Sequence, residues 1–458
     1  MTPARFFAVD LFAGCGGLSE GFRQSGIDVI ADVEMNNWAC QTLQTRHIYY
    51  ELKEMKNLRL YNEYLRGAIS LDRIYQEYPE LKERVSSKVV RATLGAEETS
   101  TILRQIEASL RRHEGTQVHV VLGGPPCQPY SVIGRARDPN RMENDDRHYL
   151  YRHYLEILQN LEPSFFVYEN VPGLFTAETD GGRIFDRLLE DFSALNPPYE
   201  IIPPLESIRT NPRGYVLDSA NFGVPQHRKR LILIGYKRTL GARNPSIVTI
   251  FKRLQEKSLR ASKQEGVTVE DAISDLPALR AGEGEDRFYG PYPLGPALSS
   301  FQRRIRRSSP GILNHRARTH MASDLDRYRF FIERHNNGSG DALLRDLMAQ
   351  RPDLIPNHAN LKDFQDRFKV QGWKSPSSTI TAHISKDGHY YIHPDIDQCR
   401  SFTVREAARC QSFPDNFKFE GPRTEQFRQV GNAVPPRLAY HVAKAIRGEL
   451  VKIYGTQC

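Results

Sequence analysis

The sequence predicts an α/β protein in which a parallel sheet carries helices on both faces, followed by a second, smaller and more irregular domain. The first observation is the order strand, glycine turn, helix, strand, helix over residues 5–47, which opens a βαβ unit. The second is the return of short apolar strands further along the chain. The third is the loss of this rhythm over residues 240–370. A chain of 458 residues is long enough for two or three domains.

The opening unit is predicted from its apolar runs and its glycines. A glycine after the last helical residue is a common helix end, which places the first helix before Gly26. The predicted elements are a strand at 6–9, a glycine turn at 12–17, a helix at 18–25, and a strand at 27–33 that ends at Glu34.

Residues 48–117 interrupt the alternation of strands and helices. They are rich in Lys, Arg, Glu, Tyr and Leu at helical spacing, which predicts two or three helices with a solvated charged face and a weak strand at 88–90. We interpret 48–87 as a helical insertion. Later elements are predicted as strands at 118–122, 164–168 and 231–234, and helices at about 148–161, 183–194 and 436–451.

Composition and cysteine spacing restrict the class of protein. The net charge of +8 and the isoelectric point of about 9.1 suit an anionic partner. The six cysteines form no C-x-x-C pair, so we expect no zinc site, no other metal site and no disulfide framework, and a reducing compartment. No apolar run of 18 residues is present, so no membrane helix is expected.

The glycine turn at 10–17 predicts a nucleoside-type cofactor. It would let a ligand approach the backbone at a helix N-terminus, and Glu34, 18 residues past Gly16, is spaced to bind ribose hydroxyls. The pattern G-x-G-x-x-G is met only loosely, which favours a cofactor without a pyrophosphate, such as S-adenosylmethionine, over NAD. The alternatives are a plain tight turn and a nicotinamide oxidoreductase.

Two further strand ends carry reactive side chains. Cys127 follows a strand, two glycines and the stiff pair Pro125-Pro126, which suits a nucleophile better than core packing. Glu169 ends the strand at 164–168, so both are expected at the carboxyl rim of the sheet as an acid–nucleophile pair. The alternatives are a buried structural cysteine, and a helix N-cap contact of Glu169 with Asn170.

Two basic segments are candidates for binding anions. In an extended chain, Gln226, Arg228 and Arg230 would face one side, and the arginines would clamp a phosphate or a carboxylate. The run 303–307 would contact phosphates. In each case a solvated basic surface is the alternative.

Taken together and in order, these motifs resemble those of the DNA cytosine-5 methyltransferases. The matching segments are D-L-F-A-G-C-G-G at 10–17, G-P-P-C-Q-P-Y-S at 124–131, E-N-V at 169–171, Q-x-R-x-R at 226–230, R-E-A-A-R at 405–409 followed by Q-S-F-P-D, and Q-V-G-N-A-V-P-P at 429–436. One element departs from the family pattern. The family's aspartate after the third strand is missing from 91–95, so no residue is assigned to the adenine amine.

The resemblance implies S-adenosylmethionine as cofactor, S-adenosylhomocysteine as product, and a Rossmann-like methyltransferase sheet. It implies that Cys127 adds to C6 of a flipped-out cytosine while Glu169, protonated when it acts, contacts N3 and the amino group, with Arg228 and Arg230 positioning the site. Phe12 would stack on the adenine. The expected cofactor residues are Asp10, Phe12, Gly14, Gly16, Leu18, Glu34, Met35, Pro125 and Asn432, and the expected DNA contacts are Gln128, Ser131, Arg303, Arg304, Arg306 and Arg307.

The resemblance also implies an organisation and a partner. We expect a catalytic domain at 1–240, a target-recognition domain at 241–400, and a segment at 401–458 that returns to the catalytic domain. The partner would be double-stranded DNA, bound by a monomer in the cytoplasm, near the nucleoid, in a bacterial restriction–modification or related defence system with a cognate restriction enzyme or defence protein. The alternatives are a tRNA cytosine-5 methyltransferase of the same family and a non-catalytic DNA-binding homologue.

Overall fold

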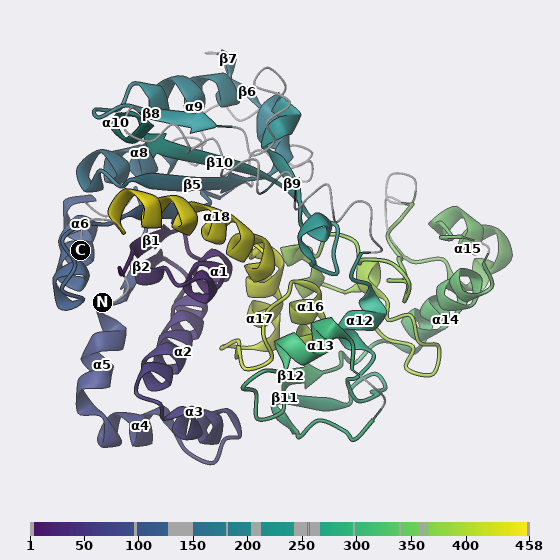
Figure 1. Cartoon of the computed structure of the whole chain (residues 1–458). Helices are drawn as coiled ribbons and strands as arrows, with labels where there is room; N and C mark the ends of the chain where they lie inside the picture. Colours follow the sequence, from purple (N-terminus) through teal and green to yellow (C-terminus); the bar gives the residue numbers. More distant parts are fainter. Residues whose placement is uncertain are drawn as a thin grey trace.

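The computed structural model describes most of the chain. The residues it describes are 4–95, 99–126, 150–179, 182–202, 212–241, 254, 256, 266–295, 298–338, 340–357, 361 and 365–455. Figure 1 shows the sheet and its helices beside a second body, which is built from residues after 266 and includes α16 (Val404–Cys410) and α17 (Arg423–Asn432), whereas the last helix, α18 (Pro436–Tyr454), lies on the sheet.

The central sheet confirms the α/β class, with the strand order β3-β2-β1-β4-β5-β10-β8 and β9 paired to β10. The first five strands in this order are parallel, whereas β10 is antiparallel to β5, β8 and β9. Strand β10 therefore adds an antiparallel edge to a mostly parallel sheet. The strands are β1 (Phe7–Leu11), β2 (Asp28–Glu34), β3 (Val89–Arg91), β4 (Val120–Gly123), β5 (Phe165–Asn170), β8 (Tyr199–Ile202), β9 (Val216–Asp218) and β10 (Lys229–Lys237).

Side chains that alternate along the strands build one core on each face of the sheet. Phe7, Val9 and Leu11 face a core shared with α6 (Thr99–Arg112), α8 (Leu150–Leu161) and α9 (Ile184–Ser193). Phe6 and Ala8 face the opposite core, shared with α1 (Gly17–Ser25) and α18 (Pro436–Tyr454). The last helix of the chain therefore packs on the first, and Figure 1 shows α18 beside α1.

Close approach of these two helices depends on glycine. A Cβ on Gly21 would lie 2.4 Å from Ala439 Cβ, 2.5 Å from the Tyr440 nitrogen and 2.6 Å from the Pro436 oxygen. Such distances can be relieved only by moving the backbone of α18. The C-terminal segment is thereby fixed against the start of the sheet.

Gly21→Ala is expected to destabilise the protein by about 1–3 kcal/mol, because the overpacked helix contact outweighs the gain of about 1 kcal/mol that alanine gives inside a helix. The measurement is the free energy of unfolding in urea. Gly266→Ala serves as the control, since its Cβ would only come within 3.6 Å of the Pro376 ring, an ordinary contact. Equal stability of the two variants would contradict the tight packing.

The segment after β2 contains more helices than the sequence indicates. Instead of two or three, it holds the end of α2 (Asn37–Glu54), then α3 (Leu58–Leu65), α4 (Leu71–Glu77), α5 (Pro79–Ser86) and α6. Local breaks divide it: Ser70 accepts a hydrogen bond from the Arg73 nitrogen at the start of α4, and Pro79 begins α5. The helices α2–α5 share a core that also contains Leu313.

The second body contains a two-stranded antiparallel sheet that the sequence does not indicate. Strand β11 (Gly284–Gly290) lies in a stretch that reads as irregular because of its glycines and acids, yet it pairs antiparallel with β12 (Ile312–Arg316). Around it lie α12 (Val269–Ile273), α13 (Ser300–Ile305), α14 (Ala322–Asn336), α15 (Leu344–Gln350), α16 (Val404–Cys410) and α17 (Arg423–Asn432). One core joins α12 and α13 to α16 and α17. This core therefore contains residues from both sides of the domain boundary predicted at residue 400.

In the described part of the chain, no helix has the length and apolar character to span a membrane.

Candidate active site

The candidate site lies at one rim of the sheet, where parallel strands end together. The strands β1, β2, β4 and β5 end at Leu11, Glu34, Gly123 and Asn170, and their neighbours in the register place these ends side by side. Ligands of open α/β sheets bind at such a carboxyl rim. The glycine turn, the Pro-Pro loop and Glu169 therefore converge, although they are far apart in sequence.

The glycine turn is held in an unusual backbone conformation. Phe12, Gly14 and Gly16 have φ values of 58°, 56° and 89°, in the left-handed region. This region strains a phenylalanine, and backbone strain of this kind concentrates at functional sites. A Cβ on Gly14 would meet no atom within 4 Å, whereas one on Gly16 would lie 2.8 Å from Leu43. Gly14 thus faces open space, as a backbone that cradles a ligand must.

Glu34 is bound to this turn. One carboxylate oxygen accepts a hydrogen bond from the Gly14 nitrogen at 2.8 Å, and the other accepts one from the Asn36 nitrogen at 2.7 Å. Burial raises the pKa of Glu34, while these backbone donors lower it. The carboxylate stays partly exposed at the end of β2, where it can accept bonds from hydroxyl groups.

Exposed apolar side chains border Glu34. Met35 is 63% exposed and Trp38 is 37% exposed, and both are among the few large apolar side chains of the described residues left open to solvent. The Trp38 ring lies against Gly421, where a Cβ would come within 2.8 Å of it. An apolar rim beside a partly exposed carboxylate fits a nucleoside. Trp38 was not among the predicted residues; its only sequence signal is its position four residues past Glu34.

Two of the predicted cofactor residues support the turn from behind. The Asp10 carboxyl contacts Ser19 of α1, with Oδ2 accepting from the Ser19 nitrogen at 3.2 Å. Leu18 is buried in the core shared with α18. Both side chains hold the start of α1 in place and do not line the open side of the turn.

The loop after β4 lies against Glu169. A Cβ on Gly124 would come 2.5 Å from Glu169 Oε2, and the Asn170 side-chain nitrogen donates to the Pro125 oxygen at 3.4 Å. Pro125 is buried at this contact. Cys127, which follows Pro126 directly in the sequence, lies outside the described residues, as do Gln128 and Ser131.

Glu169 forms an ion pair with Arg230. Arg230 Nε lies 2.9 Å from Glu169 Oε1, and the two side chains are only 12% and 13% exposed. The pair exists because β10 is antiparallel to β5, which puts the start of β10 beside the end of β5, with Ile232 opposite Glu169. Burial raises the pKa of Glu169, and the charges of Arg230 and Arg228 oppose this rise. The alternative role of Glu169, a helix N-cap contact with Asn170, is not observed. The Asn170 side chain itself accepts a hydrogen bond from the Val171 nitrogen, while Glu169 binds Arg230.

The alternation predicted for Gln226, Arg228 and Arg230 is present, but only Arg230 reaches the carboxylate. The Arg228 guanidinium donates to the backbone oxygens of Ile380 and Gly431, the latter at 3.0 Å. The Gln226 side chain binds the Cys410 oxygen at 3.3 Å and the Gln411 side chain at 3.0 Å. These two residues fasten β10 to the C-terminal segment. Asn432, next to Gly431, is exposed at the end of α17.

The arginines of the basic run at 303–307 differ in their exposure and in their ion pairs. Arg303, Arg304 and Arg307 are exposed, and surrounding protein together with Arg437 lowers the pKa of Arg304 to about 10, so it stays charged at neutral pH. Arg306 instead pairs with Asp275, which also pairs with the buried Arg409. Arg306 therefore stabilises the second body through this pair, and its predicted contact with DNA stays a prediction.

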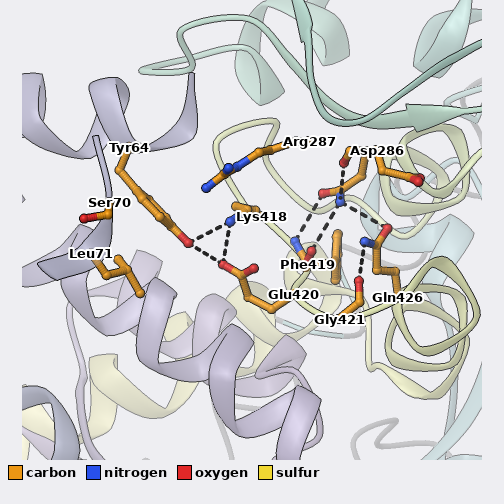
Figure 2. Close-up of a pocket in the computed structure, with 11 residues that line it drawn as sticks. Tyr64, Ser70, Leu71, Asp286, Arg287, Lys418, Phe419, Glu420, Gly421 and Gln426 are labelled. Carbon is orange, nitrogen blue, oxygen red and sulfur yellow. Dashed lines mark hydrogen bonds and ion pairs between the residues drawn. The ribbon is translucent and has the colours of Figure 1, made fainter. Parts of the chain in front are cut away.

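A cavity of about 410 Å³ lies elsewhere, between α3–α4, β11 and the residues before α17. Figure 2 shows Lys418 between Tyr64 and Glu420, with Arg287 above them. Lys418 Nζ donates to the Tyr64 hydroxyl at 2.7 Å and to Glu420 at 2.8 Å, and Tyr64 donates to Glu420 at 2.7 Å. Because these polar groups bind one another, they join α3 to the residues before α17.

Together, the mostly parallel sheet, the strained glycine turn and the carboxylate that ends β2 form a Rossmann-like fold whose strand-end rim is shaped to accept a nucleoside. Among the described residues, no group of histidine, cysteine and acidic side chains is arranged for a metal ion.

The chain belongs to the family of C-5 cytosine-specific DNA methylases, whose model matches residues 6–64 and 102–448. It is thus a DNA cytosine-5 methyltransferase of an S-adenosylmethionine-dependent family. It is 40% identical over 456 residues to the type II methyltransferase M.Bpa9945I of Bacillus paralicheniformis, covering 96% of this chain and 98% of that protein. It is 30% identical to the type II methyltransferase M.DdeI of Desulfomicrobium norvegicum, covering 96% and 88%.

A solved structure agrees with this fold. A candidate DNA modification methyltransferase encoded within an E. coli prophage superposes with a TM-score of 0.60 at 20% identity, covering 97% of this chain and 99% of that one. The family model leaves residues 65–101 unmatched, which are the end of α3, α4, α5, β3 and the start of α6. The insertion predicted at 48–87 overlaps this stretch.

Proposed function

We propose that this enzyme methylates C5 of a cytosine flipped out of double-stranded DNA through a covalent adduct between Cys127 and C6. The observation that carries the proposal is the Glu169–Arg230 pair beside the Gly124–Pro125 backbone, two residues before Cys127. A carboxyl with a raised pKa next to a nucleophile loop is the arrangement that covalent catalysis on a weakly reactive ring needs.

The chemistry balances as an addition followed by an elimination. The Cys127 thiolate bonds to C6, and Glu169 in its protonated form donates to N3, so that C5 becomes enamine-like and nucleophilic. Bound S-adenosylmethionine supplies the methyl group that C5 accepts. Loss of the C5 proton to a base then re-forms the C5–C6 double bond and expels Cys127 as a thiolate, and N3 returns its proton to Glu169.

The cofactor would be held at the glycine turn. Glu34 would accept bonds from the ribose hydroxyls, Phe12 and Met35 would contact the adenine, and Gly14 would leave room at the backbone. Trp38 extends the same apolar rim. The open space at Gly14 and the exposure of Met35 support this assignment, and Asn432 and Pro125 would line the neighbouring side.

The proposal is tested with DNA that contains 5-fluorocytosine. Because fluorine replaces the proton that must leave C5, the enzyme is expected to form a stable covalent complex with such DNA in the presence of S-adenosylmethionine. The complex is detected by denaturing gel electrophoresis and mass spectrometry. Methylation of ordinary DNA without any trapped complex would reject the covalent route, and methyl transfer to tRNA but not to DNA would assign the enzyme to the tRNA alternative.

Arg303, Arg304 and Arg307 are proposed to contact DNA phosphates. Replacing all three by glutamine should weaken DNA binding and reduce the dependence of log K on log salt by about 1 per lost contact. The control replaces Arg59, Arg66 and Arg73, exposed arginines of the helical segment, by glutamine. The measurement is fluorescence anisotropy across a salt series. An equal change in slope for both triple variants would assign the effect to net charge alone.

The wider setting follows from the similar proteins. We propose a type II restriction–modification or related defence role, with a cognate restriction enzyme, and a monomer that acts in the cytoplasm. Bisulfite sequencing of DNA from cells that express the enzyme would identify the methylated site, and its absence from cells carrying an inactive variant would tie the mark to this chain.

A further inference from the structure

Behind the glycine turn, two buried carboxyl groups share a single hydroxyl. Asp10 on β1 is 1% exposed and Asp32 on β2 is 0% exposed. Ser19 Oγ in the first turn of α1 lies 2.7 Å from Asp10 Oδ2 and within hydrogen-bond distance of Asp32 Oδ1. This Asp10–Ser19–Asp32 bridge fixes the start of α1, and with it the turn whose Gly14 nitrogen binds Glu34.

The number of available protons limits how this bridge can form. A serine hydroxyl has one proton to donate, and ionised carboxylates are acceptors only. If both carboxyl groups were ionised, Ser19 Oγ could donate its proton to only one of them. The lone pairs of the second carboxylate would then repel the lone pairs of Ser19 Oγ. Both contacts are satisfied only if one carboxyl holds a proton and donates it to Ser19, which in turn donates to the second.

The surrounding charges decide which acid holds the proton. Asp32 Oδ2 lies 2.8 Å from the Arg23 guanidinium and 2.7 Å from His47 Nε2, and these partners lower the pKa of Asp32 to about 2. Asp10 Oδ1 has no hydrogen-bond partner among the described residues. Burial and the neighbouring Asp32 charge raise the pKa of Asp10 to about 8. Ionisation is therefore costly at Asp10 and favoured at Asp32.

The charge of Arg23 opposes the rise in the pKa of Asp10, but burial and the Asp32 charge outweigh it. Arg23 on α1 is already paired with Asp32, and burial lowers the pKa of His47 on α2 to about 3, so this ring is neutral. Burial raises the pKa of Cys15 in the turn and of Tyr154 on α8, and a negative charge on Asp10 would raise both further. These two groups therefore also stay neutral near pH 8.

We infer that Asp10 is a positioning residue that acts as a neutral carboxylic acid, donating its proton to Ser19 so that the bridge holds the cofactor turn in its binding conformation. Loss of this proton would place two anions across one hydroxyl and loosen the start of α1. The inference rests on the proposed cofactor site, but the protonation of Asp10 can be measured without any ligand.

The test compares wild type, Asp10→Asn and Asp10→Ala for binding of S-adenosylhomocysteine by calorimetry at pH 7 and pH 9. If only the protonated form binds, a pKa of about 8 makes the wild-type Kd rise about tenfold between these pH values. The asparagine amide can donate to Ser19 at every pH, so Asp10→Asn should keep the wild-type Kd at pH 7 and lose this rise. Asp10→Ala should bind weakly at both pH values.

The comparison between variants removes the titration of the ligand's own amino group, which is common to all three. A Kd for Asp10→Asn that is more than tenfold above wild type at pH 7, or that rises with pH as in wild type, would overturn the inference.

Infrared difference spectra of ligand-free wild type and Asp10→Asn at pH 7 give a second readout. The carbonyl stretch of a protonated acid must be present in wild type alone. If wild type binds no S-adenosylhomocysteine at either pH, the cofactor assignment fails, while the infrared result still decides the state of Asp10.

Discussion

Cys127→Ser is expected to lower methyl transfer to DNA by at least about 10³-fold while S-adenosylhomocysteine binding persists. A serine hydroxyl is scarcely ionised at neutral pH and adds poorly to C6, whereas a thiolate is both more populated and more nucleophilic. Cofactor binding should be retained because the glycine turn and Glu34 belong to other strand ends. The measurements are transfer of a labelled methyl group to DNA and calorimetric binding of S-adenosylhomocysteine.

The control for this variant is Cys399→Ser. Cys399 is buried in the second body, and its thiol donates to the Leu325 oxygen at 3.2 Å, a bond that serine can also make. Activity near the wild-type level in Cys399→Ser and none in Cys127→Ser would assign the chemistry to one thiol. Full activity of Cys127→Ser would reject the covalent mechanism.

Glu169→Gln is expected to lower kcat by about 10²–10⁴-fold, the usual contribution of a positioned general acid. The amide keeps the shape of the side chain and a hydrogen-bond donor, but it cannot transfer a proton to N3. Glutamine also loses the ion pair with Arg230, so the Kd for DNA should be measured together with kcat. The control is Glu162→Gln. Glu162 is exposed, precedes the first residue of β5 and pairs with Lys237, so it lies at the end of the strand away from Glu169.

The pH dependence of kcat offers an independent check on Glu169. Burial raises its pKa, and because the protonated form acts, the rate should fall as pH rises through that pKa. Removing the charge of Arg230 in Arg230→Met leaves only the Arg228 charge to oppose burial, so the alkaline decline should shift to higher pH, while the rate itself falls because Glu169 loses its partner. A shift to lower pH would show that the carboxylate is the active form.

The resemblance of the ordered motifs identified the family, and local patterns gave most of the elements that carry those motifs. Apolar runs and glycines predicted β1, α1 and β2 to within one or two residues, because these elements are set by short-range periodicity and a glycine helix end. The sheet of β11 and β12 was missed because the half-exposed, alternating strand β11 is stabilised by partners as distant in sequence as Gly284 and Arg316. The divisions among α3, α4 and α5 were missed because a continuous charged pattern conceals short capping signals.

Residue type and order were sufficient to predict the α/β class and the family, and they named the candidate reactive groups. The tertiary structure decided which of those groups meet. Glu169 pairs with Arg230 only because β10 runs antiparallel to β5, and Arg228, in the same motif, is drawn into binding Ile380 and Gly431. Asp10 likewise faces Ser19 and Asp32 rather than the open side of the turn. Strand direction and burial are collective properties of the packed chain, so no local pattern encodes them.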